Sequence, residues 1–324
     1  MPTLIALAVL LPGGTVSVAP CFCYFVNLRS RFGGMIRERN CAGRAFRCID
    51  AFGNDVGAGV DECVSSAAIV ERLEMHRYAD IPWDEQIVGC SNAIKSGRYT
   101  GKDLAAAFND RGAAYRVTGD FDHAIQDYNQ AIKLNPNDAT AFYYRGIANG
   151  MRGQSDRAIQ DFSQAIKINP NHVGALCSRG LTYSNKGLWD RAIQDYDEAI
   201  KLSPNYVRAI SNRGNAYLAK RQYDRAIQDY DQAIKLDLNE AIPLNNRGNA
   251  YYQIGQVDRA IQDFDLAITL NPNYPDALNN RGLAYISKGQ YDRAIQDFDQ
   301  VLKLDPKDAD TIRNRAMAIA RKNN

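Results

Sequence analysis

The chain has 324 residues, with 39 Lys and Arg against 37 Asp and Glu, and so a formal net charge of +2. This balance argues against a nucleic-acid-binding protein, which usually carries a basic surplus. The apolar fraction of 45% and the mean hydropathy of −0.40 favour a folded, water-soluble type of chain over a disordered or multi-span membrane protein.

A short apolar run opens the chain. Residues 4–11 have about the length of the hydrophobic region of a signal peptide, and residues 17–19 (Ser-Val-Ala) fit a cleavage site. No Lys or Arg precedes the run, Pro20 would follow the cut, and the run is too short to span a bilayer. Three interpretations stay open: a signal peptide that directs the protein to the periplasm or outside the cell, a disordered leader on a cytoplasmic protein, and a start codon assigned too early, with Met35 or Met75 as the true start.

Residues 1–80 show no repeat and are expected to form a poorly ordered leader that contains most of the cysteines. Five of the seven cysteines lie in this leader, and Cys90 follows it. If the protein is exported, Cys63 and Cys90 are the best candidates for a disulfide; if it is cytoplasmic, both are thiols. There is no C-x-x-C pair, which argues against a zinc site.

A constant period of about 34 residues governs the rest of the chain, and such a period decides the architecture. An Arg-Gly pair recurs six times, and a run reading A-I-Q-D-[YF] follows each pair. The arginines are Arg111, Arg145, Arg179, Arg213, Arg247 and Arg281. Arg315 continues the series, with Ala316 in place of the glycine.

Each period predicts two helices joined by a turn. In the last full unit, residues 277–287 place apolar or small residues at helical spacing, and a turn follows at residues 289–291. Asp292 is expected to cap the second helix, and Pro306 to stop it after Leu304. Gly282 is expected to lie where the two helices approach closely.

This pattern resembles the tetratricopeptide repeat (TPR) family, whose unit is a helix–turn–helix of about 34 residues. The resemblance implies an all-α fold, a right-handed superhelical solenoid with six repeats over residues 105–308 and a capping helix over 309–324. A degenerate half-repeat over residues 81–104 precedes them, with a second-helix pattern from Trp83 to Lys95. The junction, with Gly-Cys-Ser at 89–91, Ser-Gly-Arg at 96–98 and Asn-Asp-Arg-Gly at 109–112, is similar to that of bacterial TPR-array proteins of unassigned role.

Four residues depart from the family pattern. Asn149 replaces the usual tyrosine, Ser155 an aromatic residue, Arg221 a turn glycine and Leu238 the terminal proline. Arg221 and Leu238 both belong to the fourth repeat.

The resemblance also implies a binding surface, because the first helices of TPR proteins line a concave groove that receives an extended peptide or a partner helix. Asparagines recur there and offer both donors and acceptors to a peptide backbone. They are Asn212, Asn215, Asn245, Asn246, Asn249, Asn279, Asn280 and Asn314. The alternative is that asparagine at these places serves helix packing or solubility. In the first half of the groove, Tyr143 and Tyr144 suggest a more aromatic surface.

The repeated arginine is itself a departure, because TPR units usually carry leucine at that place. An aspartate follows each arginine at the same offset in all six units. We expect partly buried Arg–Asp pairs between the two helices of each repeat. The predicted pairs are Arg111–Asp127, Arg145–Asp161, Arg179–Asp195, Arg213–Asp229, Arg247–Asp263 and Arg281–Asp297. The alternative role, ligand binding through these arginines, stays open.

No catalytic motif was found, neither G-x-S-x-G nor H-E-x-x-H, and the three histidines are far apart. The sequence therefore predicts no enzyme, no cofactor, no metal, no nucleic-acid partner and no small-molecule substrate. Two binding functions remain. In one, the groove captures a segment of a partner protein, as in a scaffold or assembly factor. In the other, the chain pairs with itself as a structural homo-oligomer, which the polar end at residues 321–324 disfavours.

Overall fold

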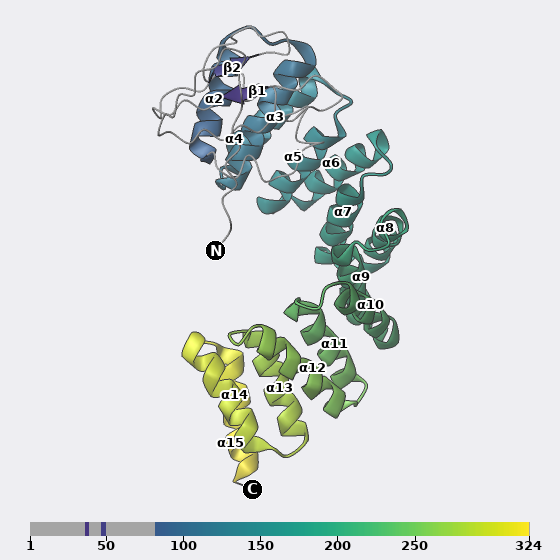
Figure 1. Cartoon of the computed structure of the whole chain (residues 1–324). Helices are drawn as coiled ribbons and strands as arrows, with labels where there is room; N and C mark the ends of the chain where they lie inside the picture. Colours follow the sequence, from purple (N-terminus) through teal and green to yellow (C-terminus); the bar gives the residue numbers. More distant parts are fainter. Residues whose placement is uncertain (1–35, 39–46, 50–81, 324) are drawn as a thin grey trace, which may run out of the picture. The chain divides into compact units, whose positions relative to one another are not determined.

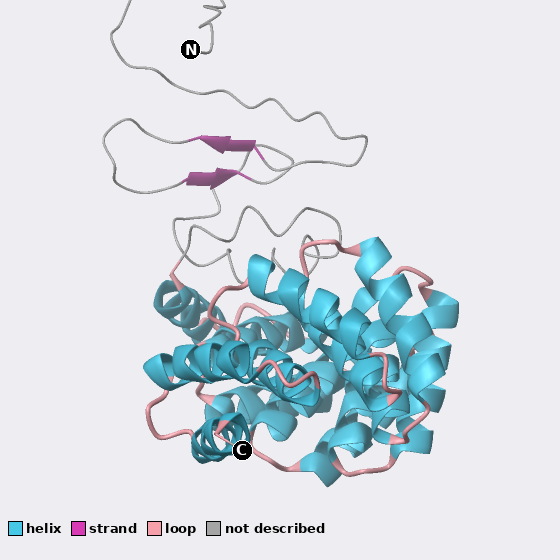
Figure 2. Ribbon diagram, turned by 90° about the horizontal axis from the view of Figure 1, so that it is seen from below, coloured by secondary structure: helices cyan, strands magenta, loops and turns pink. Residues whose placement is uncertain are grey.

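The structure is a computed structural model, and it describes residues 36–38, 47–49 and 82–323. The described residues are helical apart from short connections and two strands (Figure 2). Strand β1 (Ile36–Glu38) pairs antiparallel with β2 (Arg47–Ile49), with Ile36 opposite Ile49. The sequence did not predict these strands.

The chain divides into two compact units, Met1–Arg111 and Gly112–Asn324. Within the first unit, α2 (Trp83–Lys95) buries Cys90 and Ala93, and Ala107 of α3 (Gly101–Val117) belongs to the same cluster. Arg111 donates a hydrogen bond of 3.0 Å from Nη1 to Oγ of Ser91 on α2. Residues 1–35, 39–46 and 50–81 lie outside the described part.

The second unit is an all-α solenoid of helix pairs that follow one another in chain order along a curved array (Figure 1). The first helices of the pairs are α5 (Ala139–Met151), α7 (Val173–Asn185), α9 (Val207–Ala219), α11 (Ala241–Gln253) and α13 (Pro275–Ser287). The second helices are α4 (Phe121–Leu134), α6 (Ser155–Ile168), α8 (Trp189–Leu202), α10 (Tyr223–Leu236), α12 (Val257–Leu270) and α14 (Tyr291–Leu304). The last helix is α15 (Ala309–Lys322).

The second helices begin two residues earlier than a cap at the repeated aspartate would allow. α14 starts at Tyr291 after Gln290, and no side chain caps it, so the expectation that Asp292 is the cap is wrong. Asp292 lies inside the first turn, where a carboxylate still favours the positive end of the helix dipole. It pairs instead with Lys322 of α15.

The tight turns inside the repeats depend on a left-handed residue. Five turns use a glycine with positive φ, among them Gly187 (φ 74°) and Gly255 (φ 79°). The fourth repeat uses Arg221 in the same conformation, with φ 58°, and it is the one such non-glycine residue in the described part of the chain. A side chain in this region costs roughly 1–2 kcal/mol.

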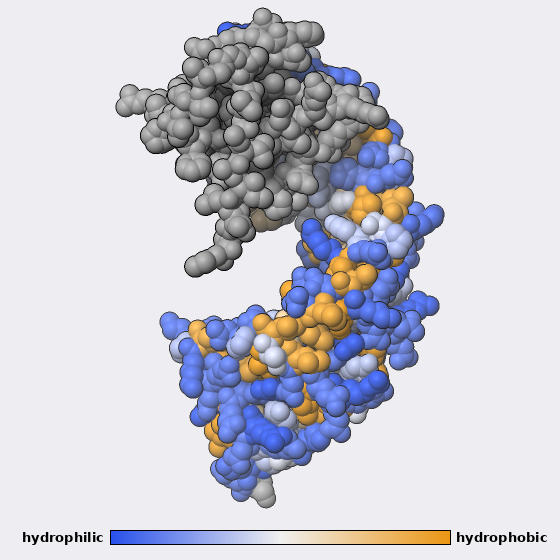
Figure 3. All heavy atoms as spheres, in the orientation of Figure 1, coloured by the Kyte–Doolittle hydropathy of each residue, from blue (hydrophilic) through white to orange (hydrophobic). Residues whose placement is uncertain are grey.

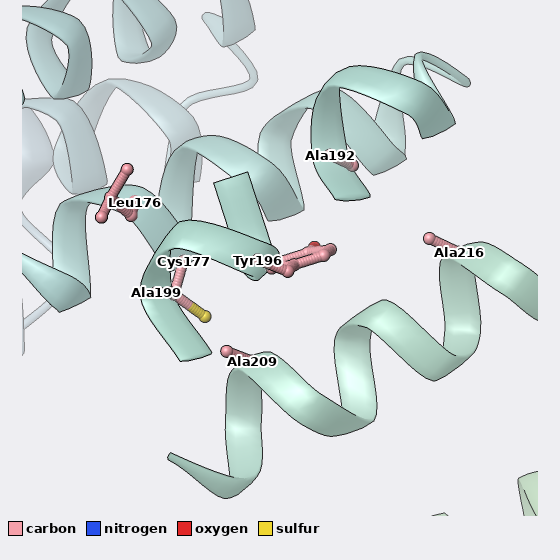
Figure 4. Packing of buried hydrophobic residues seen from close by; sticks show 7 residues of the cluster. All are labelled: Leu176, Cys177, Ala192, Tyr196, Ala199, Ala209 and Ala216. Carbon is pink, nitrogen blue, oxygen red and sulfur yellow. The ribbon is translucent and has the colours of Figure 1, made fainter. Parts of the chain in front are cut away.

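Aromatic rings fill the space opposite the repeated glycines. A Cβ at Gly282 would lie 2.6 Å from Cε1 of Phe298, and one at Gly214 would lie 2.8 Å from Cε1 of Tyr230. The close neighbour is thus a ring of the second helix rather than its backbone. Tyr196 of α8 faces Gly180 of α7 in the same way, and Figure 4 shows this ring among buried residues of α7 and α9, including Cys177 and Ala209.

Candidate functional site

The five arginines from Arg145 to Arg281 each form a hydrogen-bonded ion pair with the buried aspartate of their own repeat. Arg213 donates from Nε and Nη2 to Asp229 at 2.9 and 2.6 Å, and Arg247 does the same to Asp263 at 2.8 and 2.7 Å. The aspartate side chains are only 5–8% exposed in these five repeats. The corresponding contacts are Arg145–Asp161, Arg179–Asp195 and Arg281–Asp297. Arg111 and Asp127 belong to different units, so their pairing stays a prediction.

The same guanidinium also reaches back to the preceding repeat, which the sequence did not predict. Nη1 of Arg213 donates to Asp197 of α8, and Nη1 of Arg247 donates to Asp231 of α10, both at 2.6 Å. Arg281 bonds Asp265 in the same way. The aspartate stands at the same offset before each of these three arginines, and Asn129 and Ser163 take its place before Arg145 and Arg179. Each arginine therefore joins three helices from two repeats.

Hydrogen bonds to these acceptors stabilise the charged form of the arginines within the array. The hydrogen bonds that Arg213 donates to Asp229 raise the pKa of Arg213, and those that Arg247 donates to Asp263 raise the pKa of Arg247. Because all three guanidinium nitrogens are occupied by acceptors of the same chain, the geometry favours a structural role over ligand binding. Asn149, which replaces the usual tyrosine, adds a hydrogen bond of 2.8 Å to Asp161.

A second set of ion pairs links successive repeats on the outside. A basic residue at the end of a first helix contacts the repeated aspartate of the preceding second helix. The pairs are Arg152–Asp122, Lys186–Asp156, Lys220–Asp190, Lys288–Asp258 and Lys322–Asp292. Ile254 stands at this place in the fifth repeat, so Asp224 has no such pair within the described residues. The aspartates are 64–81% exposed, and each pair contributes at most about 1 kcal/mol.

The asparagines of the first helices form a continuous chain of hydrogen bonds across three repeats. Asn280 on α13 donates to Oδ1 of Asn245 on α11 at 3.0 Å. Asn245 donates to Asn246 at 3.1 Å, and Asn246 donates to Asn215 on α9 at 2.9 Å. The hydroxyl of Tyr230 closes the chain with a bond of 2.7 Å to Asn215. Asn245 is buried, at 5% exposure, and its two polar atoms bond its neighbours.

The other predicted groove asparagines lie outside this chain. Nδ2 of Asn212 lies 3.9 Å from Sγ of the buried Cys177, which is a weak contact. Asn279 accepts from Thr311 of α15 at 2.8 Å, and Asn249 accepts from Gln253. Asn314 is half-buried and has no hydrogen bond from its side chain within the described residues.

The two adjacent tyrosines point to different neighbours. The Tyr144 ring stacks on Tyr128 with centroids 6.2 Å apart, and it packs against the core of the first repeat. The Tyr143 ring lies 4.7 Å from the ring of His172 and 6.0 Å from that of Phe162. Both tyrosines are half-buried. The Tyr143 and Tyr144 rings also contact each other, with centroids 5.1 Å apart, so the aromatic side chains around α5 form one connected cluster.

The remaining features to place are the predicted disulfide, metal binding and a membrane-spanning helix. Cys90 is buried, and Cys63 lies outside the described part, so the disulfide between them stays a prediction. Within the described residues no group of three or more His, Cys, Asp or Glu side chains is arranged to hold a metal ion. In the same part of the chain, no helix combines the length and apolar character needed to cross a bilayer.

Comparisons with known proteins match the repeated part of the chain. Family models described as tetratricopeptide repeat match residues 139–172, 162–194 and 275–308, and a model described as TPR repeat matches residues 112–153, 185–220, 214–255 and 248–287. These matches run without a gap from residue 112 to residue 308. No curated protein matches the chain.

Several solved structures share the fold. A tetratricopeptide repeat protein from Parabacteroides merdae ATCC 43184 is 19% identical, with a TM-score of 0.59 over 81% of this chain and 99% of that one. The pilF protein of Pseudomonas aeruginosa is 18% identical, with a TM-score of 0.60 over 67% and 100%. A chain of the APC/C hetero-tetramer Cut9-Hcn1 is 17% identical, with a TM-score of 0.60 over 79% and 52%. At these identities the likeness concerns the fold alone.

Proposed function

Because the chain belongs to the tetratricopeptide repeat family, a family of non-catalytic interaction modules, we propose that it is a protein-interaction scaffold or assembly factor. Its first helices bind an extended segment or a helix of a partner protein along the face that carries the asparagines. The observation that carries this proposal is the chain of carboxamides that runs across α9, α11 and α13.

These carboxamides retain bonding capacity for a peptide backbone. Each side chain has two N–H donors and an oxygen that accepts up to two bonds. Asn280 uses one donor, and its oxygen has no partner within the described residues. Asn212 makes only the weak contact to sulfur, and Asn314 makes none in that part of the chain. A peptide that crosses these helices therefore finds a row of donors and acceptors at one-repeat intervals.

The bonds among the asparagines also fix the side chains before a partner arrives. Asn246 is held from both sides, by Asn245 and by Asn215. A side chain that is already ordered loses less conformational entropy on binding. The internal bonds thus support the binding role as well as packing, and the two interpretations of the sequence are compatible.

In the first half of the array we propose an aromatic surface around α5. Tyr143, Tyr144 and His172 offer ring surface to apolar side chains of the same partner, and the buried Tyr128 supports the Tyr144 ring from behind. Met151, at the end of the same helix, is 66% exposed. Half-buried rings with polar ends are well suited to interfaces.

The proposal is tested by affinity capture from a lysate of the source organism with the full chain. One variant carries Asn212, Asn280 and Asn314 changed to alanine, which spares Asn246 and the buried Asn245. The control carries alanine at Gln194, Gln228 and Gln262, three exposed carboxamides that occupy the same position in three successive second helices.

Circular dichroism first establishes that both variants are folded. We expect a partner that the wild type and the glutamine variant retain and that the asparagine variant loses. A partner that all three proteins retain equally would place recognition away from the asparagine face and would contradict the proposal.

The alternative is a structural repeat protein that associates with itself, and the end of the array argues against it. In each regular repeat the second helix places a ring against a glycine, where a Cβ would meet it at 2.6–2.9 Å. α15 carries the exposed Ala316 at that place, so the second helix of another copy cannot dock there in the regular way. Light scattering across a concentration series distinguishes the two functions.

A further inference from the structure

One exposed position in the first helices of the second half of the array carries a different kind of side chain in each repeat. These residues are Arg208 on α9, Ile242 on α11 and Asp276 on α13, one in each of three successive repeats. All three are exposed, and Ile242 is 53% exposed. The row therefore presents a cation, an apolar group and an anion in order along the array.

This row lies on the same face as the asparagine chain. Each member stands four residues before an asparagine, namely Asn212, Asn246 or Asn280. Residues four apart on a helix lie one above the other on one face. Because Asn246 bonds to α9 and Asn280 bonds to α11, that face is where successive first helices meet. The row thus runs beside the donors and acceptors of the proposed groove.

The apolar member has a second exposed neighbour in the chain. Leu238, 71% exposed, precedes Ile242 by four residues and stands where the other five repeats have proline. In Figure 3, hydrophobic residues form a band over the middle of the array, where α9 to α13 lie. Two large apolar side chains exposed at one connection indicate a place that a partner covers.

The charged members form no ion pair that a partner would have to break. Neither Arg208 nor Asp276 takes part in an ion pair within the described residues, whereas the repeated arginines and most of the repeated aspartates do. Arg208 would attract an acidic side chain and Asp276 a basic one, so a peptide with a single sign of charge is repelled at one end of the row.

The spacing of the row fixes the spacing of the peptide. Packed helices lie about 8–10 Å apart, and an extended chain advances about 3.3 Å per residue. One repeat therefore corresponds to about three peptide residues.

We propose that the groove selects an extended peptide that carries an apolar side chain with an acidic residue about three positions to one side and a basic residue about three positions to the other. Arg208 reads the acidic residue, Ile242 the apolar one and Asp276 the basic one. This selectivity rests on the proposed function, since it specifies the peptide that the first helices bind.

The test pans a phage-displayed library of random 12-residue peptides on the immobilised full chain. The reading variant carries Arg208→Asp with Asp276→Arg, which keeps the net charge and inverts the row. The matched control carries Glu198→Lys with Lys201→Glu on α8, an exposed pair that the exchange preserves. The asparagine variant described above, with alanine at 212, 280 and 314, is panned in parallel.

We expect the wild type and the α8 control to enrich the same pattern of acidic, apolar and basic residues, and the inverted variant to enrich the opposite order. With synthetic peptides in fluorescence anisotropy, exchange of the two charged residues should weaken binding to the wild type at least tenfold and restore it to the inverted variant.

Two results would overturn the inference in different ways. In the first, the wild type and the inverted variant enrich the same peptides, and the asparagine variant does not. This result would support the groove as the binding site but refute the charge selectivity. No enrichment by the wild type over bare support would remove both the selectivity and the peptide-binding function on which it rests.

Discussion

Loss of the buried aspartate of one repeat should destabilise the array far more than loss of the exposed aspartate that bonds the same arginine. Arg247 donates two bonds to Asp263, whose side chain is 5% exposed, and one bond to Asp231, whose side chain is 52% exposed. Removal of one member of a buried ion pair costs roughly 3–5 kcal/mol, because the other charge stays buried without its partner. Arg247 is 18% exposed and keeps Asp231, so we expect about 3 kcal/mol, the lower end of that range, for Asp263→Ala.

The control is Asp231→Ala, which removes an acceptor that lies mostly in solvent. Exposed ion pairs contribute about 0.2–1 kcal/mol, and the grip on Asp263 remains. Repeat arrays do not always unfold in one step. The assay therefore combines urea unfolding followed by circular dichroism with hydrogen exchange of the amides in α11 and α12. Equal costs for the two variants, or a cost below about 1 kcal/mol for Asp263→Ala, would refute the reasoning.

Three further predictions concern single residues. Gly248→Ala should destabilise the protein by about 1–3 kcal/mol, because its Cβ would lie 2.6 Å from the ring of Phe264. The control Gly150→Ala, whose Cβ meets nothing closer than 3.8 Å, should stabilise the protein by about 0.5–1 kcal/mol. Thermal melts that rank the two variants in the opposite order would contradict this account of the packing. Arg221→Gly should raise stability by about 1 kcal/mol, since it relieves a left-handed side chain; an unchanged urea midpoint would show that the turn carries no strain. Burial lowers the pKa of His172 below its ordinary value of 6.5, so the unfolded chain binds a proton here more readily than the folded chain. The stabilising contribution is therefore complete above pH 6.5 and declines as the pH falls below it. His172→Asn should flatten this part of the pH–stability curve, and identical curves for the two proteins would contradict this prediction.

The periodicity of the sequence was enough to predict the repeat architecture. A constant spacing between identical Arg-Gly pairs specifies helix pairs that stack, and α13 and α14 end at the expected residues Ser287 and Leu304. The beginning of α14 was predicted wrongly, because an aspartate near a helix start is equally compatible with the cap and with the first turn. Only the backbone geometry distinguishes these two places.

Contacts between repeats were harder to predict than contacts within one. The sequence pairs each arginine with the aspartate that follows it in the same repeat, but Asp231, at the same offset before Arg247, was not recognised as a second acceptor. The chain of bonds from Asn280 to Asn215 likewise joins residues of three helices, and its direction depends on how closely these helices approach. Periodicity shows which residues are equivalent, whereas the superhelical twist decides which of them meet.

The measurement that tests the central claim most directly is site-specific photo-crosslinking of the captured partner. A benzophenone side chain is placed at Ile242 on a first helix or at Leu266 on a second helix, two apolar positions that are 53% and 52% exposed. If the first helices form the binding surface, the partner crosslinks from position 242 and not from position 266. A crosslink from 266 alone would contradict the account and place recognition on the second helices.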